Sequence, residues 1–170
     1  MERVGRVCHR STAGNTLMET EMRNDNGFTA HDRSLPFVGP EAIDAACLAC
    51  FDYEYADKAH GRDMEIVIET EEFTSVCPFS GLPDFAQVVI SYVPDKECLE
   101  LRSLKYYLLS YRNVGIWYEH LANRMLEDLV AACRPQRMTV NLVCNARGGL
   151  TSTLTVAYEA HKDASQPDAQ

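Results

Sequence analysis

The sequence lacks the features that mark membrane, secreted and nucleic-acid-binding proteins. No run approaches the roughly 18 consecutive apolar residues of a membrane-spanning helix, and residues 1–10 lack the apolar core of a signal peptide. Positive charge is scarce, because 16 Lys and Arg residues stand against 25 Asp and Glu residues, for a formal net charge of -9. This balance counts against a protein that holds long nucleic acids by neutralising phosphates. We therefore expect a soluble, cytoplasmic protein without a nucleic-acid or membrane partner.

Two common ligand-binding patterns are also missing. There is no Walker A sequence and no G-x-G-x-x-G fingerprint, so a nucleotide would have to bind in an unconventional way. Cys47 and Cys50 form a Cys-x-x-Cys pair, but a structural zinc site needs two further ligands, and no second pair accompanies them. Cys77, Cys98 and His120 only weakly resemble a catalytic zinc site. We expect that no metal is required.

The sequence is long enough for one folded domain with flexible ends. It has 170 residues, of which 46% are hydrophobic, and this is sufficient for a substantial core. The polar residues 1–40 show no sustained periodicity and predict a flexible N-terminal arm. We expect the domain at 41–160 and a flexible tail at 161–170. Seven cysteines, an odd number, favour mostly free thiols in a reducing compartment.

Alternating apolar and polar residues predict four β-strands in two pairs. These strands lie at residues 64–69, 85–93, 138–144 and 150–158. A hairpin signal at 145–149 joins the last two. Earlier in the chain, the apolar residues 45–51 look like a short helix.

Between the two pairs of strands, apolar residues recur at helical spacing. The first predicted helix begins at Leu101, and the second carries an apolar face of Trp117, Leu121, Met125 and Leu129 and ends before Pro135. The order strand–strand–helix–helix–strand–strand predicts an α+β fold, with an antiparallel sheet and both helices on one of its faces. The opposite face would carry three apolar residues that a second subunit is expected to bury. These are Val67, Val89 and Val93.

Residues 73–85 (FTSVCPFSGLPDF) contain the most informative candidate chemistry. Two prolines and a glycine predict a shaped loop that holds Cys77 and Asp84 between strands. A thiol needs a neighbouring proton acceptor or donor to act as a nucleophile, and a carboxylate could fold back beside it. A buried loop cysteine with a turn-stabilising aspartate explains the same residues, and this segment alone does not decide between the two.

Other candidates carry charge near the start of a predicted helix. Arg102 and Lys105 share a helix face, and a helix N-terminus flanked by cations suits a phosphate group; a solvated amphipathic face is the alternative. Arg147 could add a guanidinium at a hairpin tip or simply belong to a turn. Glu119 could accept two hydrogen bonds from a guanine-like base or only favour the helix dipole.

Taken together, the segments resemble the NADPH-dependent 7-cyano-7-deazaguanine reductases, the nitrile reductases of queuosine biosynthesis, a tRNA modification. The resemblance covers about residues 50–158 and rests on three segments: FTSVCPFSGLPDF at 73–85, ELRSLKYYLLSYRN at 100–113 and ARGG at 146–149. It implies a tunnelling fold, in which ββααββ subunits form stacked pentameric rings with active sites between neighbouring subunits. The homo-oligomer expected from the apolar sheet face agrees with this.

The resemblance also implies roles for individual residues. Cys77 matches the nucleophile that forms a covalent thioimide with the nitrile, and Asp84 matches the general acid/base. The substrate-binding positions are Leu99, Glu100, Leu101, Tyr118 and Glu119. The cofactor-binding positions are Arg102, Ser103, Lys105 and Arg147. The chain departs from many relatives in carrying Tyr118 where they have His, and Arg102 where Lys is usual.

The implied activity is the NADPH-dependent reduction of 7-cyano-7-deazaguanine to 7-aminomethyl-7-deazaguanine. An N-terminal lid over the site is a further hypothesis. One alternative is an amidine-forming relative that acts on nitrile-bearing tRNA, although the intact segment at 100–105 favours hydride chemistry. A zinc-dependent pterin or GTP enzyme of the same fold and a non-catalytic, ring-forming purine-binding protein are the others.

Overall fold

The computed structural model describes residues 36–56 and 64–160. The predicted tail and nearly all of the predicted N-terminal arm lie outside this part of the chain, as does the suggested lid. Within the described residues, no helix is long and apolar enough to cross a membrane.

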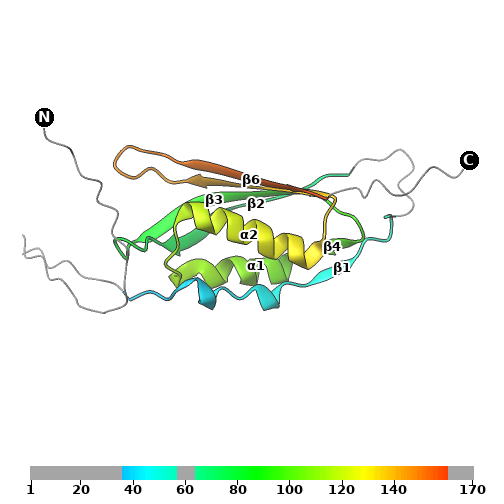
Figure 1. Cartoon of the computed structure of the whole chain (residues 1–170), viewed down its shortest axis with the longest axis horizontal. Coiled ribbons are helices and arrows are strands. Elements are labelled where there is room, and N and C mark those ends of the chain that lie inside the picture. The colour runs from blue at the N-terminus through cyan, green and yellow to red at the C-terminus, as the bar shows by residue number, and fades with distance from the viewer. Residues whose placement is uncertain (1–35, 57–63, 161–170) are drawn as a thin grey trace, which may run out of the picture. The chain divides into compact units, whose positions relative to one another are not determined.

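A four-stranded antiparallel sheet with two helices on one face makes up the domain (Figure 1). Its strands follow the order β2-β3-β5-β6: β2 (Ile66–Val76), β3 (Pro83–Val93), β5 (Arg137–Cys144) and β6 (Thr153–Glu159). The helices are α1 (Leu101–Ser110) and α2 (Tyr118–Cys133). The predicted α+β class and the predicted element order are therefore confirmed.

Shorter elements connect and flank this frame. A second, two-stranded sheet pairs β1 (Cys50–Asp52) with β4 (Glu97–Leu99), and three 3-10 turns complete the set: η1 (Pro40–Ala42), η2 (Ala45–Cys47) and η3 (Tyr111–Asn113). The helix predicted at residues 45–51 was wrong, because only its first part forms a single helical turn. Its second part pairs with β4, so a partner distant in sequence decides its conformation.

The core lies between the sheet and the helices. Alternate residues of β3 and β5, including Val88 and Val140, are completely buried against the predicted apolar face of α2. That face consists of Leu121, Met125 and Leu129, all completely buried. Each such side chain contributes about 1.5–3 kcal/mol relative to an exposed one. Trp117 does not belong to this face, because it is the N-cap residue of α2 and is half exposed.

A β-bulge in β2 decides which residues of its second half face the helices. Thr70 lies opposite Val88, whereas Phe73 lies opposite Ala86, so β2 carries one extra residue between these pairs. An extra residue exchanges the two faces of a strand. Phe73 is consequently buried in the core. The predicted loop that holds both Cys77 and Asp84 was too long, since only residues 77–82 connect the strands and Asp84 already belongs to β3.

A buried hydrogen-bond network joins the two helices. The hydroxyls of Tyr107 and Tyr111 lie 2.7 Å apart, and the Tyr107 hydroxyl donates to the Asp128 carboxylate at 2.9 Å. Asp128 also forms an ion pair with Arg124, at 2.8 Å. Tyr111 then packs its ring against Phe73 of β2. The network fixes α1 against α2 and both against the sheet.

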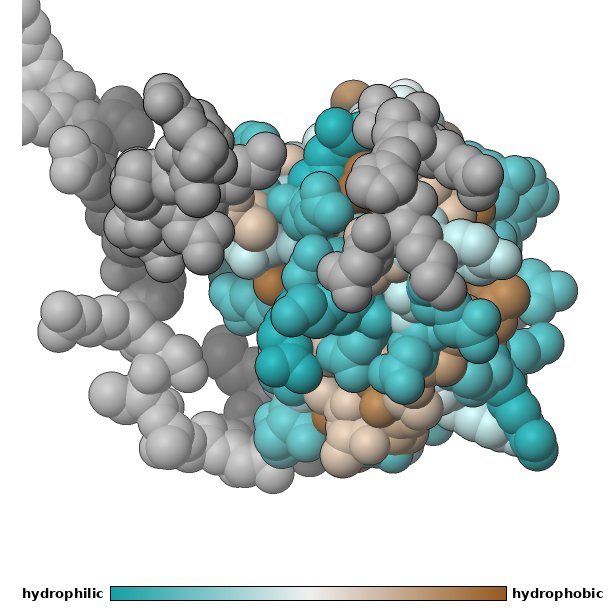
Figure 2. Space-filling view, turned by 90° about the vertical axis from the view of Figure 1, so that its right-hand side faces the viewer, coloured by the Kyte–Doolittle hydropathy of each residue, from teal (hydrophilic) through white to brown (hydrophobic). Residues whose placement is uncertain are grey.

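The face of the sheet opposite the helices is open in the single chain. Val67 is 57% exposed, and Val89 and Val93 are only partly buried. The expectation that a second subunit covers this face stays a prediction. At the end of the domain where β1 and β4 lie, hydrophilic residues cover most of the described surface and hydrophobic ones form small patches between them (Figure 2).

Candidate active site

A tight connection between β2 and β3 holds Cys77. The Cys77 N–H donates to the Leu82 carbonyl at 2.9 Å, and the Gly81 N–H donates to the Cys77 carbonyl at 2.8 Å. Gly81 has a φ of 68°, a left-handed conformation that glycine adopts without steric cost. The turn places the buried Cys77 directly after the strand that packs on the helices.

The surroundings of Cys77 favour its thiolate. Burial raises the pKa of the thiol, but hydrogen bonds from the Ser80 hydroxyl, the Ser80 and Phe79 backbone and Arg147 outweigh burial and lower the pKa to about 7. The other cysteines behave differently: burial raises the pKa of every other thiol in the described part of the chain. The thiolate is the nucleophilic form of cysteine, so among the described cysteines the surroundings of Cys77 are the ones that favour a nucleophile.

Asp84 lies at the start of β3, whereas Cys77 directly follows the neighbouring strand β2. Its side chain is almost completely buried and forms an ion pair with the Arg147 guanidinium, which reaches back from the β5–β6 connection. Arg147 also donates to the Pro83 carbonyl at 2.9 Å. The guanidinium thus contacts both Cys77 and Asp84 and links them. The prediction that Asp84 lies in a loop was wrong, because it pairs with Ser75 in the sheet.

Tyr118, at the start of α2, completes this group of side chains. Its buried hydroxyl has no hydrogen-bond partner among the described residues. Of its neighbours, the Cys144 thiol has the largest electrostatic effect on it. Burial, followed by the neighbouring Cys144 and Cys77, raises the pKa of the Tyr118 hydroxyl to about 12. Cys144 was not predicted, since only the pairing of β5 with β3 brings it here. Glu119 follows on the exposed surface of the helix.

Unpaired buried polar atoms gather at this site. Among the described residues, three buried side-chain oxygens lack both a hydrogen-bond partner and an ion-pair partner: Ser75 Oγ, the Tyr118 hydroxyl and Asn141 Oδ1. Asp84 Oδ1 has only its ion-pair partner, Arg147. Ser75 lies opposite Asp84 in the sheet, and the Tyr118 hydroxyl lies near Cys77. Buried polar groups are nearly always paired, so a cluster of exceptions marks a place where a ligand or water supplies the partner.

The start of α1 has a different character. Glu100 is its N-cap, and its carboxylate accepts hydrogen bonds from the Arg102 and Ser103 backbone, both at 2.8 Å. These bonds lower the pKa of Glu100. The buried Ser103 hydroxyl donates to the Glu100 carbonyl and accepts from the Ala49 N–H. Leu99 is buried in the core. These contacts give Leu99, Glu100 and Ser103 structural roles.

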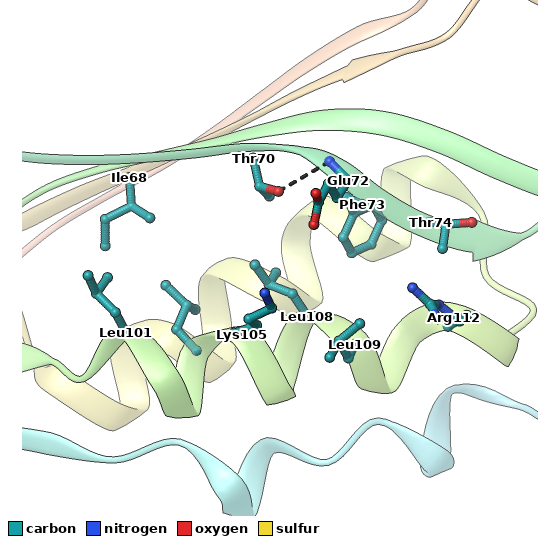
Figure 3. A pocket seen from close by; sticks show the side chains of 11 residues that line it. Ile68, Thr70, Glu72, Phe73, Thr74, Leu101, Lys105, Leu108, Leu109 and Arg112 are labelled. Carbon is teal, nitrogen blue, oxygen red and sulfur yellow. Dashed lines mark hydrogen bonds between the residues drawn. The ribbon is translucent and has the colours of Figure 1, made fainter.

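A cleft between β2 and α1 contains the remaining predicted cations. Its volume is about 260 Å³. Figure 3 shows Lys105 and Arg112 on the helical side of the cleft, with Glu72 and Phe73 reaching towards them from β2. Leu101 also contributes to the apolar wall, whereas the exposed Arg102 does not line the cleft. Lys105 lines the cleft from α1, and Arg112 lines it from η3, which directly follows α1. The sequence shows Arg112 as part of a group of positive charges with Arg102 and Lys105, but it does not show the position of Arg112 beside β2.

No three His, Cys, Asp or Glu side chains in residues 36–56 and 64–160 are arranged to hold a metal ion. The candidate site therefore consists of a thiol with a lowered pKa, a buried carboxylate with its guanidinium and an unpaired hydroxyl. The cation-lined cleft between β2 and α1 is a second feature, and it is lined by other residues.

Comparison with known proteins gives the family. A model described as "QueF-like protein" matches residues 83–163. The NADPH-dependent 7-cyano-7-deazaguanine reductase of Chlorobaculum tepidum is 57% identical over 113 residues, which make up 66% of this chain and 93% of that protein. That of Chlorobium luteolum is 54% identical over 113 residues, or 66% and 94% of the two chains.

The chain belongs to the family of NADPH-dependent 7-cyano-7-deazaguanine reductases. The family resemblance predicted from the sequence is thereby confirmed, and these reductases are NADPH-dependent enzymes by name. A solved structure, the archaeosine synthase QueF-Like in the apo form, is similar with a TM-score of 0.54 and 26% identity. The match covers 58% of this chain and 96% of that one, and it supports the fold.

Proposed function

We propose that this chain reduces the nitrile of 7-cyano-7-deazaguanine to the primary amine of 7-aminomethyl-7-deazaguanine, through a covalent thioimide on Cys77. Family membership supports the overall reaction. The observation that carries the covalent step is the lowered pKa of the buried Cys77, next to Arg147 and the equally buried Asp84. Addition of a thiolate makes a nitrile carbon more electrophilic and prepares it for reduction.

The proposed reaction uses the side chains in a defined order. The Cys77 thiolate attacks the nitrile carbon and forms a C–S bond, while the nitrile nitrogen takes a proton from Asp84. NADPH supplies a hydride to this carbon in each of two steps. After the first, the C–S bond breaks, its electron pair returns to Cys77, and an imine remains. Asp84 regains a proton from solvent, and the second hydride and this proton give the amine. In total, the nitrile consumes two NADPH and two protons.

The cleft between β2 and α1 is the proposed site for NADPH. Lys105 and Arg112 supply two cations on one wall for its phosphate groups, and the leucines around them supply an apolar surface. An arginine binds phosphate oxygens through two parallel donors, whereas a lysine acts as a compact charge. The deazaguanine itself would meet the exposed Glu119, whose carboxylate can accept two hydrogen bonds from a guanine-like edge.

We also propose that the active protein is a homo-oligomer of ring form. Within the described sheet, β2 and β6 each have one unpaired edge, which proteins normally cover. Large apolar side chains also stand on the loops of the site, with Phe79 87% and Leu150 78% exposed. A neighbouring subunit could cover both and exclude water, which would otherwise hydrolyse the imine.

The proposed function is tested by measuring NADPH oxidation with purified full-length protein and 7-cyano-7-deazaguanine. We expect two NADPH consumed for each nitrile, formation of the amine, and loss of both reactions in Cys77→Ala. Cys47→Ala is the matched control, because its thiol has a raised pKa and bonds only to backbone carbonyls. Nitrile binding without NADPH oxidation would contradict the proposal.

The structural similarity to an archaeosine synthase keeps the amidine-forming reaction as the second candidate. In that reaction ammonia, and not a hydride, would add to the thioimide on Cys77. Incubation of the nitrile substrate, in free or tRNA-borne form, with an ammonium salt separates the two. An amidine product formed without NADPH would favour the second candidate and exclude the first.

A further inference from the structure

Ser75 carries a buried hydroxyl for which the proposed reaction gives no role. Its residue is 0% exposed, and its Oγ has no hydrogen-bond partner among the described residues. A buried hydroxyl without a partner destabilises a protein relative to an apolar side chain of the same size. The neighbouring Thr74 does not provide the partner, because its hydroxyl donates to the Ser75 carbonyl.

The sheet brings this hydroxyl to Asp84. Ser75 and Asp84 are directly opposite each other in the pairing of β2 with β3. Side chains of such a pair lie on the same face, with Cβ atoms about 4.5–5.5 Å apart. Asp84 is 4% exposed, and its Oδ1 contacts the Arg147 guanidinium as an ion-pair partner. A carboxylate offers about four acceptor sites, so this contact leaves capacity for a further donor. A buried donor without an acceptor therefore faces a buried carboxylate that can accept another hydrogen bond.

The β-bulge makes this arrangement possible. Without the extra residue between Thr70 and Phe73, Ser75 would lie on the opposite face of the sheet. With it, the hydroxyl is placed two residues before Cys77 and on the same side as Asp84. Arg147 forms an ion pair with Asp84 from the β5–β6 connection, so Ser75 approaches the carboxyl group from a different element.

We propose that Ser75 is a positioning residue whose hydroxyl donates a hydrogen bond to Asp84 and orients its carboxyl group for proton transfer. The inference rests on the proposed function, in which Asp84 supplies protons to the bound nitrogen. With Arg147 and Ser75 both in contact, the carboxyl group has two fixed partners and one preferred orientation. A carboxyl group without this orientation slows each proton transfer, but it does not prevent the Cys77 thiolate from forming the C–S bond.

The expected effect therefore falls on turnover and not on binding. In Ser75→Ala, we expect kcat to fall about tenfold, a change that corresponds to one lost interaction in the transition state. The KM for the nitrile should change less than about twofold, and the nitrile should still add to Cys77. A merely structural role would instead lower thermal stability and weaken nitrile binding and adduct formation together.

A matched pair of variants isolates the hydroxyl. The side chains of Thr and Val have nearly the same shape, but Thr has a hydroxyl where Val has a methyl group. Any steric clash in the buried site therefore affects both variants equally. We expect Ser75→Thr to retain about tenfold more kcat than Ser75→Val. Ser91→Ala, which removes a hydroxyl elsewhere in β3, serves as the control. Equal kcat values in the Thr and Val variants would overturn the inference.

A measurement without turnover separates this inference from the proposed function. Ser75→Ala, Asp84→Ala and the double variant form a cycle in urea unfolding, and a direct hydrogen bond makes their effects non-additive. Additive effects would overturn the inference even if the wild-type protein is a reductase. Non-additive effects in a protein that oxidises no NADPH would support the Ser75–Asp84 bond and refute the proposed function.

Discussion

Removal of the Ser80 hydroxyl should slow the reactions of Cys77 at neutral pH. Burial raises the pKa of the Cys77 thiol, and hydrogen bonds from Ser80, Phe79 and Arg147 lower it from 9.0 to about 7. Ser80 supplies both its hydroxyl and its N–H, and the hydroxyl has the largest lowering effect. Because these bonds stabilise the charged form, their loss raises the pKa and reduces the amount of thiolate.

The magnitude follows from the two ionised fractions. At pH 7, a thiol with a pKa of about 7 is half ionised, whereas one at the ordinary value of 9.0 is about one-hundredth ionised. The surroundings as a whole, with the hydrogen bonds opposed by burial, thus increase the thiolate population about fiftyfold. As Ser80→Ala removes only one of them, we expect alkylation of Cys77 at pH 7 to slow by about fivefold.

The assay is alkylation by iodoacetamide between about pH 6 and pH 10, followed by the mass of the peptide that contains Cys77. The variant should react more slowly than the wild type near neutral pH and equally fast at the alkaline end. Ser80→Thr, which keeps the hydroxyl, should behave as the wild type. The reasoning is refuted if Ser80→Ala slows alkylation by the same factor at every pH, since that result indicates altered access and not altered ionisation.

Two further predictions concern the cleft and the helix pair. Lys105→Ala and Arg112→Ala should each raise the KM for NADPH about tenfold and leave the KM for the nitrile unchanged. Steady-state kinetics measures both constants, with Lys96→Ala as the control. Equal changes in the two KM values would contradict the cofactor assignment. Tyr107→Phe should lower the free energy of unfolding by about 1–3 kcal/mol, because Asp128 loses a buried hydrogen bond. Urea titrations measure this loss, and the exposed Tyr106→Phe is the control. A similar loss of stability in the control would contradict the prediction.

Local patterns were sufficient to predict the main elements. The apolar faces of β3 and α2 repeat at strand and helix periods, and the residues that carry them are the buried ones. Arg134, in a left-handed conformation, ends α2 immediately before Pro135, as the proline predicted. Periodicity of this kind depends only on residues close in sequence, which is why it could be read directly.

The misplaced and missing features depend on pairing between distant segments. The bulge in β2 cannot be recognised from alternation alone, and it decides that Ser75 faces Asp84. Cys144 reaches the site only through the register of β5 with β3. Prolines in residues 73–85 suggested a loop around Asp84, but Pro83 and Asp84 open a strand, where a proline is tolerated.

The central claim is a covalent bond between Cys77 and the nitrile carbon. It is tested most directly by the intact mass of the protein after incubation with 7-cyano-7-deazaguanine in the absence of NADPH. We predict an increase equal to the mass of one nitrile for each chain, located on the Cys77 peptide, absent in Cys77→Ala and removed when NADPH is added. An unmodified protein that nevertheless reduces the nitrile, or an adduct on another cysteine, would contradict the account.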